Sequence, residues 1–378
     1  MRAFLIVMDS VGCGHAPDAA DFGDEGSDTL GHIHAQVGLK MPNLTRLGLG
    51  RVVDGMAGSA EGLHGVAREH SPGKDTPTGH WELAGVPVPW TWHYFPETTP
   101  AFPAEISQAV ADFCGTDGIL GDSHASGTEV IERLGEAHIR TGKPICYTSV
   151  DSVFQIAAHE AHFGLERLLD LCRHMAPMLH EMKVGRVIAR PFLGSDASNF
   201  MRTPHRRDFA IETPAPTLLD WAKADGRATY AVGKIGDIFS GRGIDETRKG
   251  PDAELMTHLH DLVREAEPGS FTFANFVEFD TNFGHRRDPE GYAGHLEWFD
   301  AAIGPVLADL REGDLMIFTA DHGNDPTWRG TEHTREQVPV IGAGVGARDI
   351  GQVNFVDVAA SVADHLGLSE RGPGRSFL

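Results

Sequence analysis

Three mainly apolar runs, each followed by an aspartate, constrain the fold of this chain most, and the first of them is uninterrupted. Residues 3–8 (AFLIVM) lead into Asp9, residues 271–279 (FTFANFVEF) lead into Asp280, and residues 314–320 (DLMIFTA) lead into Asp321. Apolar runs without polar alternation are typical of strands that are buried on both faces. Such strands need helices above and below them, so the three runs predict an α/β fold with a parallel sheet.

Helical spacing around these runs indicates the same architecture. Residues 292–310 place apolar side chains at helical intervals between two of the predicted strands, and residues 355–368 predict a further amphipathic helix over the sheet. Ligands of parallel sheets bind beyond the carboxyl ends of the strands. We therefore expect the three acidic loops to build one site at that edge.

The middle of the chain has a different composition. It begins near a cluster of proline and aromatic residues at 87–103, ends near 212–217, and carries its own helical pattern (165–182) and strand pattern (185–192). This change predicts an inserted domain. The predicted units are a catalytic core of residues 1–92 and 214–378 and an inserted domain of residues 93–213.

The charge balance excludes whole classes of partner. Lys and Arg number 32 against 54 Asp and Glu, a formal net charge of −22, which is the wrong sign for a nucleic acid or an anionic membrane. No stretch approaches the roughly 18 apolar residues that a membrane helix needs. The four cysteines form no C-x-x-C pair, which favours a reducing compartment. We expect a cytoplasmic monomer that acts on small molecules.

Carboxylates and imidazoles gather after the predicted strands. Asp280 and His285 flank a short loop, Asp321 and His322 are adjacent, and His333 follows closely. Each residue alone is as well explained as a turn former or a surface side chain, but together they indicate a site for two metals. Oxygen and nitrogen ligands suit manganese, zinc or magnesium. The predicted ligands are Asp9, Asp280, His285, Asp321, His322 and His333.

Residues 71–82 (SPGKDTPTGHWE) offer a nucleophile for such a site. A threonine hydroxyl next to metals ionises more readily, and both Thr76 and Thr78 qualify. The prolines and glycines also fit a plain turn. Lys74 is either a phosphate-binding residue or a solvated loop lysine.

Several long motifs, in this order, resemble a known family. They are VMDSVGCGHAPDA (7–19), GKDTPTGHWE (73–82), NFMRTPHRRDFA (199–210), VEFDTNFGHRRDPEGY (277–292) and TADHGNDPTWRGTEHTRE (319–336). The chain resembles the prokaryotic phosphopentomutases of the alkaline phosphatase superfamily. The resemblance implies an alkaline-phosphatase-like core, with a mainly parallel central sheet flanked by helices, and a smaller inserted α/β cap.

The resemblance also implies roles for single residues. Asp9, Asp321 and His322 would hold one Mn²⁺, while Asp280, His285 and His333 would hold the second. Thr76, rather than Thr78, would be the phosphorylated nucleophile and a metal ligand that bridges the two ions, and a sugar bisphosphate would be the activator. The implied substrate-binding residues are Asp151, Arg186, Ile188 and Arg202 in the cap and Lys234 in the core.

The implied reaction interconverts ribose 1-phosphate, or its 2-deoxy analogue, and the 5-phosphate through phosphothreonine and a 1,5-bisphosphate. The alternatives are a metal-dependent phosphatase or phosphodiesterase, a mutase for another sugar phosphate, and a catalytically silent binding protein. The chain departs from the family pattern at residues 86–97 (VPVPWTWHYFPE), where the connection into the cap is rich in proline and tryptophan. This departure concerns cap opening and sugar preference.

Overall fold

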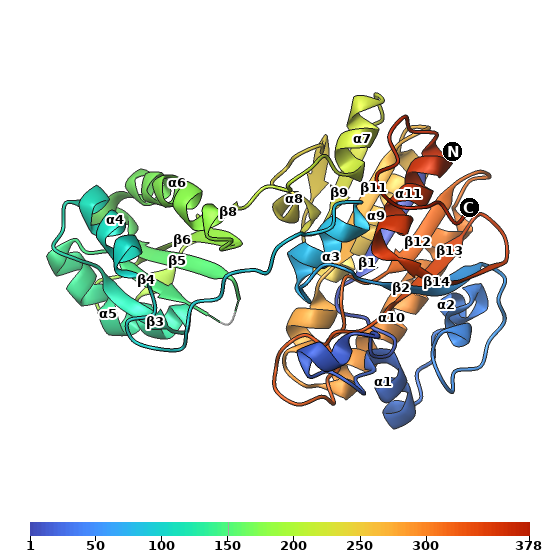
Figure 1. Cartoon of the computed structure of the whole chain (residues 1–378), viewed down its shortest axis with the longest axis horizontal. Coiled ribbons are helices and arrows are strands. Elements are labelled where there is room, and N and C mark those ends of the chain that lie inside the picture. Colours follow the sequence, from blue (N-terminus) through green and yellow to red (C-terminus); the bar gives the residue numbers. More distant parts are fainter. Residues whose placement is uncertain (150) are drawn as a thin grey trace. The chain divides into compact units, whose positions relative to one another are not determined.

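The computed structural model describes residues 1–149 and 151–378. It divides the chain into two units (Figure 1). The core unit comprises Met1–Pro89 and Thr213–Leu378, and the cap unit comprises Trp90–Glu212. The two domain boundaries predicted from the sequence lie three residues and one residue, respectively, to the C-terminal side of these.

The core unit contains an eight-stranded sheet in the order β10-β9-β11-β1-β12-β13-β2-β14. Only β13 runs antiparallel to its neighbours among these strands, so the predicted mainly parallel α/β architecture is confirmed. The strands are β1 (Ala3–Met8), β2 (Leu63–Arg68), β9 (Thr229–Val232), β10 (Glu246–Arg248), β11 (Phe271–Phe276), β12 (Leu315–Thr319), β13 (Val338–Ala343) and β14 (Arg348–Asn354).

Helices cover the core sheet in two groups. In one group α11 packs on α3 and α7, and in the other α10 packs on α1, α2 and α9. The predicted strand at 3–8 is β1, whose six side chains are all buried, as a strand covered on both faces requires. The helices are α1 (Thr29–Val37), α2 (Pro42–Leu47), α3 (Thr76–Leu83), α7 (Leu218–Ala224), α8 (Ile235–Ile238), α9 (Asp252–Glu265), α10 (Pro289–Ala308) and α11 (Phe355–Leu366), with helical turns η1 (Ala19–Phe22), η2 (Leu49–Arg51) and η4 (Phe279–Gly284).

The register of the sheet brings three loops together. Met8 of β1 lies beside Phe276 of β11, and Val7 lies beside Thr319 of β12. Because all three strands are parallel, the chain leaves them at one edge of the sheet. The acidic segments that follow must therefore meet there.

Local contacts explain two of the differences between the predicted and the observed boundaries. The run 271–279 forms a strand only to Phe276, because Phe279 opens the helical turn η4. Helix α10 starts at Pro289 and not at 292, because the Asp288 carboxylate caps it by accepting the Gly291 N–H at 2.9 Å.

The cap unit has its own sheet, in the order β3-β4-β5-β6-β7 with β8 beside β6. Helices α4 and α6 cover one face and α5 covers the other, so successive residues of β5 enter two separate cores. The elements are β3 (Leu120–His124), β4 (Ile145–Thr148), β5 (Val153–His159), β6 (Arg186–Leu193), β7 (Met201–Arg202), β8 (Arg207–Ala210), α4 (Ala104–Cys114), α5 (Gly127–Thr141), η3 (Glu160–Gly164) and α6 (Leu165–Glu181).

Among the described residues, no helix has the length and apolar character needed to cross a membrane.

Candidate metal centre and nucleophile

The six residues predicted to bind metals converge at the carboxyl edge of the core sheet. Ligand atoms of Asp9, Asp321 and His322 lie within 4.8 Å of one another, and those of Asp280, His322 and His333 do so as well. His322 thus belongs to both groups. The Nε2 atom of His285 lies 3.1 Å from Asp280 Oδ2 and 3.2 Å from His333 Nε2, which places the sixth residue at the same centre.

Main-chain carbonyls hold all three histidines in one orientation. Each Nδ1 lies within hydrogen-bond distance of a carbonyl oxygen, which fixes the proton on Nδ1 and leaves the Nε2 lone pair toward the cluster. Metal-binding histidines commonly have such a hydrogen bond from the ring nitrogen that does not bind the metal. The pairs are His285 with Thr331 (2.7 Å), His322 with Gly323 (3.1 Å) and His333 with Lys74 (2.8 Å).

The carboxylates are buried and only partly satisfied. Asp9 Oδ2 accepts a hydrogen bond from Asn275 (2.8 Å) and Asp280 Oδ1 accepts one from Asn324 (2.7 Å). Asp9 Oδ1 is buried and has no hydrogen-bond partner among the described residues. Burial, with repulsion from Asp321 and Asp280, raises the pKa of Asp9 well above its ordinary value. A bound cation would give the unpaired Oδ1 atom of Asp9 a partner.

The donor set fits divalent ions. Three carboxylates and three imidazoles suit Mn²⁺ or Zn²⁺, and no thiol takes part. Burial lowers the pKa of His322 to about 4, so this histidine is neutral and able to bind a metal at neutral pH. Burial alone would raise the pKa of Asp280, but His333 and His285 outweigh it and hold the pKa well below its ordinary value.

A further side chain, the buried His80, connects the segment that carries Thr76 to the carboxylates. Its Nδ1 lies 2.9 Å from the Thr76 carbonyl oxygen and 3.0 Å from Asp321 Oδ2. Its Nε2 lies 3.2 Å from Asn275 Nδ2, whose amide also donates to Asp9. Because the amide nitrogen can only donate, Nε2 accepts and Nδ1 carries the proton. His80 and Asn275 therefore link the Thr76 carbonyl to Asp9 through one chain of hydrogen bonds, and Asp321 Oδ2 lies close to that chain.

Thr76 is the first residue of helix α3, so the alternative of a plain turn is excluded. Its Oγ1 lies 3.3 Å from His322 Nε2, beside the metal ligands. The hydroxyl of Thr78 instead donates to Asp75 Oδ2 at 2.7 Å, as part of the helix cap. The geometry thus favours Thr76 as the residue whose hydroxyl faces the centre.

Lys74 lies two residues before Thr76, and its ammonium group forms an ion pair with another segment. Its Nζ lies 2.7 Å from Asp24 Oδ2 in a partly buried ion pair, which matches neither expectation for this lysine. The buried Arg335 guanidinium holds the same loop by donating to the carbonyls of Gly73 (2.5 Å) and Glu69 (2.8 Å). These contacts attach the loop before Thr76 to the core.

Comparison with known proteins assigns the family. A model described as "Metalloenzyme superfamily" matches residues 1–370. The chain is 54% identical to a phosphopentomutase of Methylorubrum extorquens over 403 residues, covering 100% of both chains. It is 52% identical to a phosphopentomutase of a Chelativorans species, covering 100% of this chain and 98% of that protein. The chain belongs to the phosphopentomutase family.

A solved structure agrees with this assignment at the level of fold. The PH0037 protein from Pyrococcus horikoshii matches 97% of each chain with a TM-score of 0.50 and 16% identity. The alkaline-phosphatase-like fold class expected for a phosphopentomutase is therefore confirmed.

The residues predicted to bind substrate lie in both units. In the cap, Arg186 pairs with Asp151 (3.5 Å) and Asp208 (3.7 Å), and Ile188 is only 2% exposed. Lys234, in the core, follows β9 and is exposed. Ile188 is also paired on both sides within the cap sheet, with Gln155 of β5 and Asp208 of β8, so its contact with a substrate stays a prediction.

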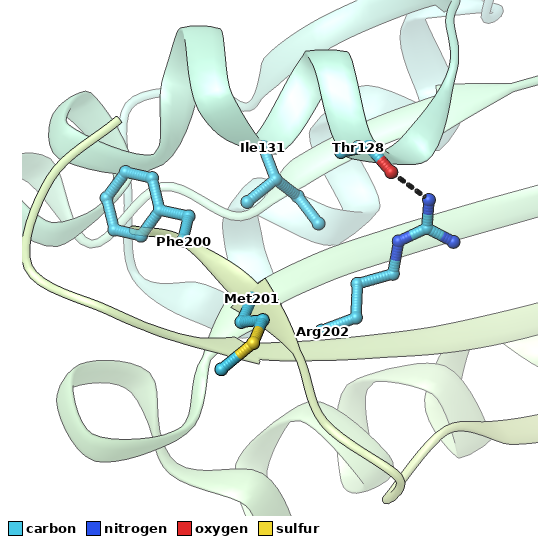
Figure 2. A pocket seen from close by; sticks show the side chains of 5 residues that line it. All are labelled: Thr128, Ile131, Phe200, Met201 and Arg202. Carbon is cyan, nitrogen blue, oxygen red and sulfur yellow. Dashed lines mark hydrogen bonds between the residues drawn. The ribbon is translucent and has the colours of Figure 1, made fainter. Parts of the chain in front are cut away.

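Arg202 lines a cavity of about 300 Å³ in the cap. Figure 2 shows its guanidinium hydrogen-bonded to the hydroxyl of Thr128 at the start of α5, with Ile131 and Phe200 forming the apolar part of the wall. The hydroxyl of the buried Tyr147 has no hydrogen-bond partner among the described residues. Tyr147 and Arg202 approach the same glycine, Gly127, at the start of α5. Arg202 is exposed at this corner of the cap, whereas the Tyr147 hydroxyl is buried.

His80, Asn275 and Asn324 were not predicted from the sequence. Asn275 gave a signal, since an amide inside an otherwise apolar buried strand needs a partner. His80 and Asn324 gave none beyond their closeness in sequence to Thr76 and Asp321.

Proposed function

We propose that this isomerase is a mutase that interconverts ribose 1-phosphate, or its 2-deoxy analogue, and the corresponding 5-phosphate. Phosphorylated Thr76 would carry the phosphoryl group. The observation that supports this role is the position of Thr76 Oγ1, 3.3 Å from His322 Nε2 at the start of a helix. The identity of about half of the sequence to phosphopentomutases over the full chain supports the substrate class.

The proposed cofactor is a pair of Mn²⁺ ions. Asp9, Asp321 and His322 would hold one ion and Asp280, His285 and His333 the other, with His322 within reach of both. When bound, the ions would stabilise negative charge on the phosphoryl oxygens and on the Thr76 oxygen.

The reaction would proceed through two phosphoryl transfers. In the first, the bond between Thr76 Oγ1 and phosphorus breaks while a free hydroxyl of the sugar phosphate forms a new bond to phosphorus. The sugar hydroxyl loses its proton, Thr76 regains a hydroxyl, and a 1,5-bisphosphate results. After the bisphosphate reorients, its other phosphate returns to Thr76, so the net change is an isomerisation. A sugar bisphosphate activator would load an enzyme that lacks phosphothreonine.

Substrate-binding roles are proposed for residues of each unit separately. In the cap, Arg186 and Arg202 would bind phosphate oxygens and Asp151 would accept hydrogen bonds from sugar hydroxyls; in the core, Lys234 would bind phosphate oxygens. These cationic side chains would attract an anion despite the net charge of −22. The four cysteines are all buried and free, which supports the proposed cytoplasmic location.

The test is conversion of ribose 1-phosphate to ribose 5-phosphate with Mn²⁺ and a trace of ribose 1,5-bisphosphate. Thr76→Ala is expected to lower kcat by at least about 10³-fold, because it removes the nucleophile. Thr76→Ser, which keeps a hydroxyl, is expected to retain measurable turnover and to yield a phosphoserine peptide. Equal turnover by wild type and Thr76→Ala would refute the proposal.

The same assay separates a mutase from a phosphatase. A mutase is stimulated by the bisphosphate and releases little inorganic phosphate. Release of one phosphate for each sugar phosphate consumed, without stimulation by the bisphosphate, would assign the chain to the hydrolases.

A further inference from the structure

A second group of metal-type ligands lies outside the centre described above. Asp252 begins helix α9, Glu278 directly precedes the turn η4, and His295 lies in helix α10. One ligand atom from each of the three residues lies within 4.8 Å of the other two. None of the three belongs to the six residues of the first centre.

The charges in this group do not balance without a further cation. Asp252 is 1% exposed, and its Oδ2 accepts hydrogen bonds from His295 Nε2 (3.0 Å) and from the Glu278 N–H (3.2 Å). Its Oδ1 is buried and has no hydrogen-bond partner in residues 1–149 and 151–378. Within the same residues, no Lys or Arg forms an ion pair with Asp252 or Glu278. One imidazolium would neutralise only one of the two carboxylates.

The imidazole is held in place before any ligand arrives. The ring of His295 stacks on Trp298 with centroids 4.8 Å apart, and the edge contact with Phe279 has centroids 4.5 Å apart. These contacts fix the ring plane and keep Nε2 directed at Asp252. A fixed imidazole beside a buried carboxylate is the arrangement that lowers the entropy cost of binding an ion.

We propose that Asp252, Glu278 and His295 form a third divalent-cation site, suited to Mn²⁺ or Zn²⁺. One nitrogen and two carboxylate donors match the preferences of these ions, and the partly exposed Glu278 leaves a route for the ion and for water ligands. Glu278 stands two residues before Asp280. An ion at this site therefore ties helices α9 and α10 to the turn that carries a ligand of the first centre.

The experiment counts bound ions. Protein is stripped with chelator, loaded with Mn²⁺ or, in parallel, with Zn²⁺, freed of excess ion by desalting, and analysed for metal per chain. Glu278→Gln is expected to bind one ion fewer per chain than wild type, because the amide is a poor ligand, and His295→Phe is expected to do the same while keeping the ring stack. The matched control is His260→Phe on α9, which loses a histidine paired with Asp309 (2.8 Å) and is expected to keep the wild-type count.

The comparison is independent of the proposed function, because it depends on a difference between variants and not on the total or on turnover. The stability readout is the rise in Tm on adding Mn²⁺, which is expected to be smaller in Glu278→Gln than in His260→Phe. Equal metal counts in wild type and Glu278→Gln would overturn the proposal and leave an ordinary ion pair between His295 and Asp252. Glu278→Gln is conservative and partly exposed, so it answers the question even if His295→Phe fails to fold.

Discussion

Replacing His80 by phenylalanine removes the hydrogen bonds of this residue and keeps most of its packing. Phenylalanine keeps a ring of similar size against Phe273 but removes both nitrogens. The Thr76 carbonyl and the Asn275 amide each lose a partner in the buried interior. Leaving a buried polar group unpaired costs about 1–3 kcal/mol, so for the two groups together we expect a loss of about 2–6 kcal/mol in the free energy of unfolding.

The same substitution is expected to weaken metal binding. Without His80, Asp321 loses its contact at 3.0 Å, and Asn275 loses the partner that helps to orient its amide toward Asp9. Loss of groups that orient metal ligands lowers affinity by about 10–100-fold, or about 1.4–2.8 kcal/mol. Calorimetric titration with Mn²⁺ measures this change, and urea unfolding in chelator measures the loss of stability.

A buried histidine of the cap, His138, provides the matched control. It is 1% exposed and also makes two hydrogen bonds, to the Lys143 carbonyl (2.6 Å) and from the His159 N–H (2.9 Å). His138→Phe is expected to lose a similar amount of stability and to bind Mn²⁺ with unchanged affinity. If both variants bind Mn²⁺ as wild type does, or if both lose affinity equally, the bridging role of His80 is refuted.

Three other outcomes follow from the core. Burial raises the pKa of Glu336 to about 8 from an ordinary 4.5, so folding favours its neutral form. The stability of the wild type should therefore decrease as the pH rises from about 4.5 to 8, and the denaturation midpoint of Glu336→Gln should depend less on pH over that range. Gly79→Ala should reduce stability and turnover, because a Cβ there would lie 2.1 Å from the Asp321 carbonyl oxygen. Gly294→Ala, on the open surface of a helix, should instead raise stability by up to about 1 kcal/mol. Equal changes in the Tm of the two variants would contradict this expectation. EDTA should lower the Tm, because Asp9 then keeps an unpartnered buried oxygen; an unchanged Tm would argue against resident cations.

The sheet and the convergence of the acidic loops could be predicted because both follow from local patterns. An apolar run of six residues indicates a buried strand, and parallel strands end at one edge whatever the rest of the chain does. The residue at which each strand ends could not be predicted, because an apolar run without alternating polar side chains does not show where a strand stops. Phe279 is as buried as the strand before it, yet it packs on Tyr292 from within a helical turn.

The supporting contacts could not be predicted because they join residues far apart in the sequence. Lys74 pairs with Asp24, 50 positions away, and His80 meets Asn275, 195 positions away. A lysine in a glycine-rich loop and a histidine in a helix have many possible partners. Only the folded chain selects among them, so the roles of His80 and Asn275 emerge from the structure.

The central position of β1 has a consequence for synthesis on the ribosome. Strand β1 pairs with β11 and β12, which are translated some 270 and 310 residues after it, so its sheet neighbours are missing during most of the intervening synthesis. The cap strands, in contrast, pair only with one another within a continuous segment. The sheet of the cap can therefore form before the apolar side chains of β1 are covered by their neighbours in the core sheet.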